Sequence, residues 1–165
     1  MPNNNEPITT KFDLFDTVGY YIVSKTLDEV TYQTPFGWPY DYYTNTTKGE
    51  IKVRNRAYDT LDVEYSKCSE LYLQEYEDRK KGVDCTYLIH YVIKNENTMY
   101  TIDLHSIIDN HTYEAVEWPT TTVGDQRTKT KVVYKIPINE WKSSYCDCSA
   151  YDDLIIRGMK KYNIK

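Results

Sequence analysis

Residues 60–81 form a long stretch without glycine or proline, and this stretch indicates a helix that needs a partner layer. Apolar and aromatic side chains recur along one face of it at helical spacing, and charged side chains lie opposite. Gly82 follows directly, and glycine commonly ends helices. We therefore predict a helix over 60–81. Its apolar face comprises Leu61, Tyr65, Cys68, Leu71, Tyr72 and Tyr76.

Two segments after this helix are typical of β-strands. Residues 85–95 and 98–108 are rich in β-branched and aromatic side chains, and only Glu96 and Asn97 separate them. We expect these two segments to be adjacent strands, with a further strand over 130–138. The 18 tyrosines favour a sheet, because tyrosine packs on one side and hydrogen-bonds on the other. An AT-rich coding sequence would also enrich tyrosine, and such a bias suits a phage or another mobile element.

The remaining segments complete a single α/β domain over residues 1–165. Apolar residues at helical spacing predict a helix over 10–27, with Thr9 or Thr10 as its N-cap. We expect residues 1–9 to be frayed, 34–40 to be a loop, and the polar stretch 109–129 to be a long loop. Residues 140–148 are expected to be irregular, and residues 150–163 to form a short terminal helix.

Charge and hydropathy narrow the classes of function. The formal net charge of −5 argues against a protein that grips nucleic acid mainly by bulk electrostatics, although a local basic rim remains compatible with it. No stretch approaches the roughly 18 apolar residues of a membrane span, and no apolar run resembles a signal peptide. We expect a cytoplasmic protein that does not bind membranes and whose four cysteines are free thiols.

A predicted hairpin brings together the residues with the clearest chemistry. Two short β-prone runs, 40–44 and 50–54, are separated by the turn-like segment 45–49. Asp41 lies on the first run and Glu50 on the second. Side chains two residues apart in a strand share a face, so Lys52 projects with Glu50 while Ile51 faces the packed side. The hairpin thus predicts two carboxylates and an ammonium in one cluster.

This cluster has the composition of a site for phosphodiester hydrolysis. Two carboxylates favour a hard divalent cation such as Mg²⁺, for which Mn²⁺ would substitute. Such an ion polarises a phosphodiester oxygen and lowers the pKa of an attacking water. Lys52 would orient or deprotonate that water, or stabilise the negative charge of the transition state.

At these residues the chain resembles the PD-(D/E)XK nuclease superfamily, which includes restriction enzymes, Holliday junction resolvases and phage exonucleases. The matching elements are Pro39-Tyr40-Asp41, with one inserted residue, and Glu50-Ile51-Lys52. The resemblance covers residues 10–108 through the order helix, hairpin, helix, strand, strand. It implies a central mixed β-sheet flanked by helices, metal-dependent cleavage of DNA, and Asp41, Glu50 and Lys52 as catalytic residues.

The same resemblance implies further positions. The backbone carbonyl of Ile51 would be a third metal ligand. An additional acid would come from or near the first helix, with Asp16 or Asp13 as candidates and Glu29 as a third. Lys67 or Gln74 would supply a basic or amide group from the second helix. A homodimer is expected where two strands must be cut.

Some assignments rest on residue type and position alone. Arg54 and Arg56 are candidate phosphate contacts. Trp38 and the pair Tyr42–Tyr43, close to Asp41, are candidates for stacking on unpaired bases, with core or hairpin packing as the alternative.

Four other interpretations stay open. An exposed hairpin with a cross-strand ion pair would show the same spacing of Asp41, Glu50 and Lys52. A catalytically inactive nuclease fold, such as a viral accessory protein, would fit the acidic charge, as would a tyrosine-rich interaction module. A zinc site is the fourth, with its four thiolates from Cys68, Cys85, Cys146 and Cys148.

Overall fold

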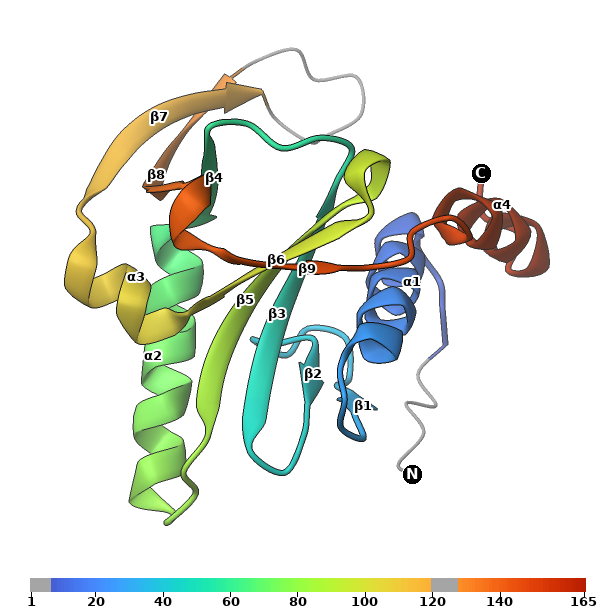
Figure 1. Cartoon of the computed structure of the whole chain (residues 1–165). Coiled ribbons are helices and arrows are strands. Elements are labelled where there is room, and N and C mark those ends of the chain that lie inside the picture. The colour runs from blue at the N-terminus through green and yellow to red at the C-terminus, as the bar shows by residue number, and fades with distance from the viewer. Residues whose placement is uncertain (1–6, 120–127) are drawn as a thin grey trace.

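A six-stranded mixed sheet forms the centre of this computed structural model, which describes residues 7–119 and 128–165 (Figure 1). Its strand order is β1-β2-β3-β5-β6-β9, and β3 and β5 are the parallel pair. A second sheet has the order β4-β8-β7. The first sheet comprises β1 (Tyr32–Gln33), β2 (Tyr42–Tyr43), β3 (Thr47–Arg54), β5 (Thr86–Ile93), β6 (Thr98–Asp103) and β9 (Lys142–Tyr145); the second comprises β4 (Thr60–Glu64), β7 (Tyr113–Pro119) and β8 (Thr128–Pro137).

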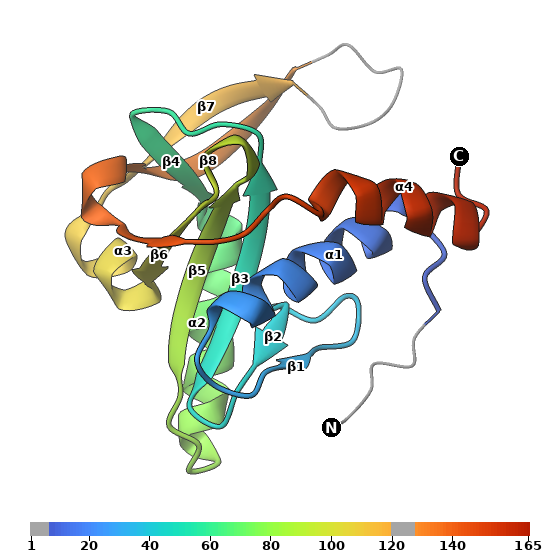
Figure 2. The ribbon, with the colours of Figure 1, turned by 45° about the vertical axis from the view of Figure 1, so that its right-hand side comes forward.

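Helices cover both faces of the six-stranded sheet, so the predicted α/β class with a flanked mixed sheet is confirmed. On one face α1 (Lys11–Thr26) and α4 (Tyr151–Lys161) lie side by side, as Figures 1 and 2 show. On the other face lie α2 (Tyr65–Lys80), α3 (Leu104–Asn110) and the second sheet. Two short 3-10 helices, η1 (Lys94–Glu96) and η2 (Ile138–Glu140), connect strands. None of the described helices is long and apolar enough to span a membrane.

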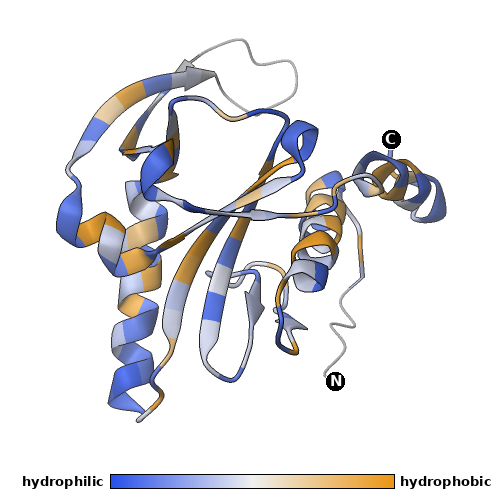
Figure 3. Ribbon diagram, in the orientation of Figure 1, coloured by the Kyte–Doolittle hydropathy of each residue, from blue (hydrophilic) through white to orange (hydrophobic). Residues whose placement is uncertain are grey.

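Strand β5 holds the two layers together because it is buried on both faces. Its residues Tyr87, Ile89, Tyr91 and Ile93 belong to the core beneath α2, α3 and the second sheet. Val92 belongs to the core beneath α1 and α4. Figure 3 shows hydrophobic colouring along this central strand. Burial on both faces is what a parallel neighbour and two covering layers impose on a central strand.

The register of β3 against β5 decides which way its side chains face. Glu50 lies opposite Ile89 and Lys52 opposite Tyr91, so both project to the α2 side. Ile51 and Val53 project to the α1 side. There Gly19 brings the helix close to the strand, since a Cβ on Gly19 would lie 3.4 Å from Val53 and 3.6 Å from Ile51. The predicted alternation along this strand is therefore correct.

The predicted helix over 60–81 is wrong in its first five residues and in part of its buried face, whose Cys68 and Leu71 are confirmed. Residues 60–64 form β4, in which Leu61 and Val63 alternate with half-buried neighbours and β8 supplies the pairing. Along α2 the buried residues are Cys68, Leu71, Glu75 and Asp78. Tyr72 and Tyr76 are exposed. Glu75 and Asp78 occupy the buried face in place of the two tyrosines, because each of these acids has charged or polar partners.

Four other boundaries also differ from the prediction. The strand predicted over 98–108 ends at Asp103, whose side chain caps α3 by accepting hydrogen bonds from the backbone N–H groups of His105 and Ser106. Residues 113–119 form β7, so the loop predicted over 109–129 is wrong there, and its part 120–127 lies outside the described residues. Residues 142–145 form β9 against β6, where an irregular segment was predicted. The hairpin turn is shorter than predicted, because β3 begins at Thr47.

The predicted helices at the two ends of the chain are confirmed. Helix α1 begins after Thr10, which forms a capping box with Asp13. The prediction that residues 1–9 are frayed lies outside the described residues over 1–6, and within its described part Thr9 hydrogen-bonds Asp13 at 3.1 Å. The predicted terminal helix is α4.

Candidate active site

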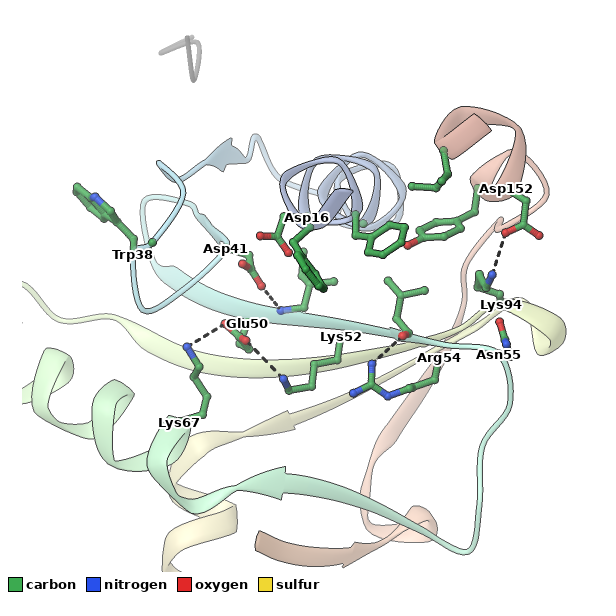
Figure 4. A pocket seen from close by; sticks show the side chains of 18 of the residues that line it. Asp16, Trp38, Asp41, Glu50, Lys52, Arg54, Asn55, Lys67, Lys94 and Asp152 are labelled. Carbon is green, nitrogen blue, oxygen red and sulfur yellow. Dashed lines mark hydrogen bonds and ion pairs between the residues drawn. The ribbon is translucent and has the colours of Figure 1, made fainter. Parts of the chain in front are cut away.

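A cleft of about 800 Å³ follows the edge of β3 that β2 leaves uncovered. β2 pairs only with Lys48 and Gly49, so the strand edge beyond Gly49 faces the cleft. Side chains from α1 and α4 line one wall, and Lys67 and Glu70 of α2 line the other. Figure 4 looks onto this edge, with Asp41 and Asp16 on one side of the strand and Glu50, Lys52 and Lys67 on the other.

The loop before β2 holds Asp41 against β3. Its backbone N–H donates to the carbonyl of Gly49 at 2.7 Å, and its carbonyl accepts from the N–H of Thr34 at 3.1 Å. Its side-chain Oδ2 accepts a hydrogen bond from the backbone N–H of Ile51 at 2.7 Å. The carboxylate is therefore fixed to the backbone between Glu50 and Lys52.

Glu50 is nearly buried and lacks a short ionic partner. Only 8% of the surface of Glu50 is exposed. The Lys52 Nζ lies 3.9 Å from its Oε1, and the Lys67 Nζ lies 3.8 Å from its Oε2. Both distances exceed hydrogen-bonding range. Lys67 donates instead to the carbonyl of Pro39 at 3.2 Å and approaches Glu70 at 3.4 Å.

Three acids at this edge, Asp16, Asp41 and Glu50, have raised pKa values. Burial, followed by the charge of Asp41, raises the pKa of Glu50 to about 8 against the lowering effect of Lys52 and Lys67. Burial also raises the pKa of Asp41, although hydrogen bonds with Ile51 and Glu50 oppose it. For Asp16, burial and then the charge of Asp41 raise the pKa to about 6. Crowded carboxylates of this kind favour a nearby positive charge.

The residues at this edge fit a hard divalent cation. Ile51 directs its N–H toward Asp41, and the N–H and C=O of one strand residue lie on the same edge, so its carbonyl faces the cleft as well. Asp41, Glu50 and this carbonyl offer the oxygen ligands that Mg²⁺ prefers, with water completing its coordination. Within the described ranges no group of three or more His, Cys, Asp and Glu side chains is arranged to hold a metal.

The structure brings some of the other predicted site residues to the cleft and leaves others away from it. Asp16, Lys67 and Arg54 line the cleft. Asp13 caps α1 instead, and Glu29 lies beyond the end of that helix. The remaining two candidates bond elsewhere, as Gln74 donates to Asp78 at 3.1 Å and Arg56 donates to the Tyr58 hydroxyl at 3.0 Å.

The four-thiolate zinc site is contradicted. Cys68 lies in the core on the α2 side of the sheet, and Cys85 packs against that same core. Cys146 and Cys148 belong to the core on the α1 side. The central sheet separates the two pairs, and all four cysteines are free.

Sequence reasoning placed Asp16 and Lys67 in the site, but it missed the other residues of α1 that line the cleft and the contribution of α4. Phe12, Phe15 and Gly19 line the cleft from α1, and their spacing of three and four residues places them on one helical face. That spacing was a usable signal. Asp152 of α4 also lines the cleft, and its carboxylate binds Lys94 of η1 at 2.8 Å. No local pattern connects two residues so far apart in the chain.

No family model matches the chain, and neither curated proteins nor solved structures show a significant similarity to it, so the nuclease resemblance rests on the residues described above.

Proposed function

We propose that the chain is a metal-dependent nuclease that hydrolyses phosphodiester bonds, with DNA as its substrate. The observation that carries this proposal is the hydrogen bond from the Ile51 backbone to the Asp41 carboxylate. It places one acid beside the strand that presents both Glu50 and Lys52 to a single cleft. The preference for DNA over RNA comes from the resemblance to PD-(D/E)XK nucleases. A homodimer and a cytoplasmic location remain predictions of the sequence.

Asp41, Glu50 and the Ile51 carbonyl would hold Mg²⁺, or Mn²⁺ in its place. When bound, the ion supplies a polarised phosphoryl oxygen and a water of lowered pKa. The protein prepares this position by burying Glu50 and Asp41 together, so that both carboxyl groups have raised pKa values in the absence of a cation. Adding positive charge there relieves their repulsion.

The two lysines and the third acid have separate roles in this proposal. Lys52 projects from the same strand face as Glu50, where its ammonium orients the attacking water and offsets negative charge that develops on the phosphoryl oxygens. Lys67 is anchored on the Pro39 carbonyl and supplies a second positive charge from α2. Asp16 faces the cleft from α1, where a carboxyl of pKa about 6 is suited to accept a proton near neutral pH.

The direct test is cleavage of labelled single-stranded, duplex and branched DNA, and of RNA, with Mg²⁺, Mn²⁺ or EDTA. We expect metal-dependent cutting, reduced by about 100-fold or more in Glu50→Gln and Lys52→Met. Glu77→Gln and Lys80→Met are matched controls, because this pair on α2 is also 3.8 Å apart but fully outside the cleft. Absence of cutting by the wild type, together with no calorimetric metal binding that depends on Glu50, contradicts the proposal.

A catalytically inactive binding or structural protein is the competing proposal, and one observation favours it. Lys52 and Lys67 both face Glu50 at under 4 Å, so the carboxylate has partial charge compensation without a cation. This alternative predicts that Mg²⁺ binds no more tightly to the wild type than to Glu50→Gln. The calorimetric arm of the test therefore separates the two proposals.

A further inference from the structure

Two exposed aromatic side chains stand at the cleft that contains the proposed active site. Phe12 is 64% exposed and Trp38 is 52% exposed, and both line the cleft. In Figure 4 Trp38 lies beyond Asp41 at one end, and Arg54, Asn55 and Lys94 lie at the other. Exposed large aromatics beside a polar site are typical of surfaces that contact a ligand.

These aromatics are held in place by the structure around them. Trp38 follows a tight turn, in which its N–H donates to the Pro35 carbonyl at 3.3 Å, and its ring contacts Tyr40 edge to face at 5.9 Å. Phe12 contacts Phe15 edge to face at 6.3 Å. The outer faces of both rings remain available, because half or more of each residue is exposed.

The charge of the cleft does not favour a duplex. Among the described residues that line it, five carry carboxylates and four carry cationic side chains. Lys94 is already paired with Asp152 at 2.8 Å. A protein that binds duplex DNA gains most of its affinity by neutralising phosphates, and this cleft offers few free cations for that purpose.

Stacking of aromatic side chains on bases is a source of affinity that requires no cation. An aromatic ring can reach the face of a base only where the base is unpaired or displaced from the helical stack. Phosphates of the same strand would lie toward the β3 edge, where Lys52 and Arg54 line the cleft. The Arg54 guanidinium is positioned there by its bond to the Val53 carbonyl at 2.9 Å and by the Tyr91 ring 5.7 Å away.

From this arrangement we infer that the cleft binds single-stranded nucleic acid, with Phe12 and Trp38 stacking on unpaired bases and the β3 edge receiving the phosphates. This inference rests on the nuclease function proposed above. It names the substrate class as single strands, or the unpaired ends and flaps of duplexes.

Binding is measured separately from cleavage so that the two proposals can fail independently. The protein is Glu50→Gln in EDTA, and the probes are a fluorescent oligo-dT of about 12 nucleotides and a blunt hairpin duplex of similar length. We expect the single strand to bind at least about 10-fold more tightly, and Trp38→Ala and Phe12→Ala each to weaken it by about 10-fold. The slope of log K against log salt should be about −1.5 to −2, as expected for two or three phosphate contacts to a single strand.

Tyr145→Ala is the matched control, since this residue is 72% exposed on β9 and lies outside the cleft. It should bind the single strand like its parent, and Trp38→Phe should retain most of the affinity.

Equal or tighter binding of the duplex, or no effect of the Trp38 and Phe12 substitutions, overturns the inference. Wild type that cuts duplex and single strands equally with Mg²⁺ upholds the nuclease and overturns the substrate class. Single-strand binding that depends on Trp38, with no cutting of any substrate, upholds the inference and overturns the nuclease.

Discussion

Strand β3 carries two clusters of acid and lysine only two residues apart, and they differ in how well the acid is satisfied. Lys48 binds Asp78 of α2 at 2.6 Å, and Asp78 also accepts hydrogen bonds from Tyr87 at 2.5 Å and Gln74 at 3.1 Å. Glu50 instead has its two lysines at 3.8 and 3.9 Å. Burial raises the pKa of Asp78, but its three partners lower it overall. The pKa of Glu50 is raised.

The contrast separates a structural ion pair from a site that is short of positive charge. A buried carboxylate with close donors has its charge compensated within the fold, so it requires no ligand. A buried carboxylate beside a second acid, with no donor in hydrogen-bonding range, lowers the stability of the fold when it is ionised. Such groups gather at functional sites, where the missing charge comes from a ligand.

Removing the lysine of the satisfied pair should have the largest effect on stability. Lys48→Met leaves Asp78 buried beside Tyr87 without its cation, and we expect a loss of about 3 kcal/mol in the free energy of unfolding. Urea unfolding followed by circular dichroism measures it. Exposed Lys80→Met should change the same quantity by less than about 0.5 kcal/mol. A loss from Lys48→Met as small as that of Lys80→Met would remove the contrast between the clusters.

Neutralising the unsatisfied acid should do the opposite and stabilise the protein. The folded-state pKa of Glu50, about 8, lies above its ordinary value of 4.5. Its ionisation therefore opposes folding, and wild-type stability should fall as pH rises from about 4.5 to about 8. Because the glutamine also leaves Lys52 and Lys67 without their carboxylate, only part of this effect should be recovered, and we expect Glu50→Gln to gain about 2 kcal/mol at pH about 8.5.

Thermal and urea unfolding across pH test this gain, with exposed Glu77→Gln as the control. The gain should disappear near pH 4, where Glu50 is protonated in both folded and unfolded chains. A Glu50→Gln variant that is less stable than wild type at alkaline pH would show that Glu50 is as well satisfied as Asp78.

The strand register made the Glu50 site partly predictable from sequence, because side chains two apart must share a face. The partner acid was harder to place. Asp41 reaches β3 through a hydrogen bond to the Ile51 backbone, and it precedes β2 by one residue instead of lying on the strand. Hairpin spacing predicts that the two acids approach each other, but the path of the loop over 34–41 decides the contact.

The satisfied cluster could not be predicted, for a related reason. The pattern of α2 points to Tyr72 and Tyr76 as buried and to Asp78 as exposed, since tyrosine is the more apolar type. Asp78 is buried instead because it pairs with Lys48, which lies 30 residues earlier in the chain. Helical periodicity describes only the helix itself, whereas the burial of Asp78 depends on a lysine from a neighbouring strand.

A cation should sharpen the difference between the clusters. If Mg²⁺ binds at Asp41 and Glu50 with a dissociation constant of about 1 mM, about 10 mM Mg²⁺ should stabilise the wild type by about 1.4 kcal/mol. Glu50→Gln should gain almost nothing. Lys48→Met should keep the wild-type gain, since its cluster takes no metal. Unfolding in Mg²⁺ against EDTA measures all three proteins, and an equal gain in wild type and Glu50→Gln would place any metal elsewhere.

The smallest effect is expected from the lysine that faces Glu50 on its own strand. Lys52→Met is the same chemical change as Lys48→Met, yet it removes a contact of 3.9 Å where the other removes one of 2.6 Å. Lys67 remains on the opposite side of the carboxylate at 3.8 Å. Glu50 can also take up a proton near neutral pH, which removes its negative charge when one cation is lost.

We expect Lys52→Met to change the free energy of unfolding by no more than about 0.5 kcal/mol at pH 7, measured by urea unfolding beside Lys48→Met. A loss as large as that of Lys48→Met would mean that Lys52 is a structural partner of Glu50, and its assignment to the attacking water would then lose its physical basis.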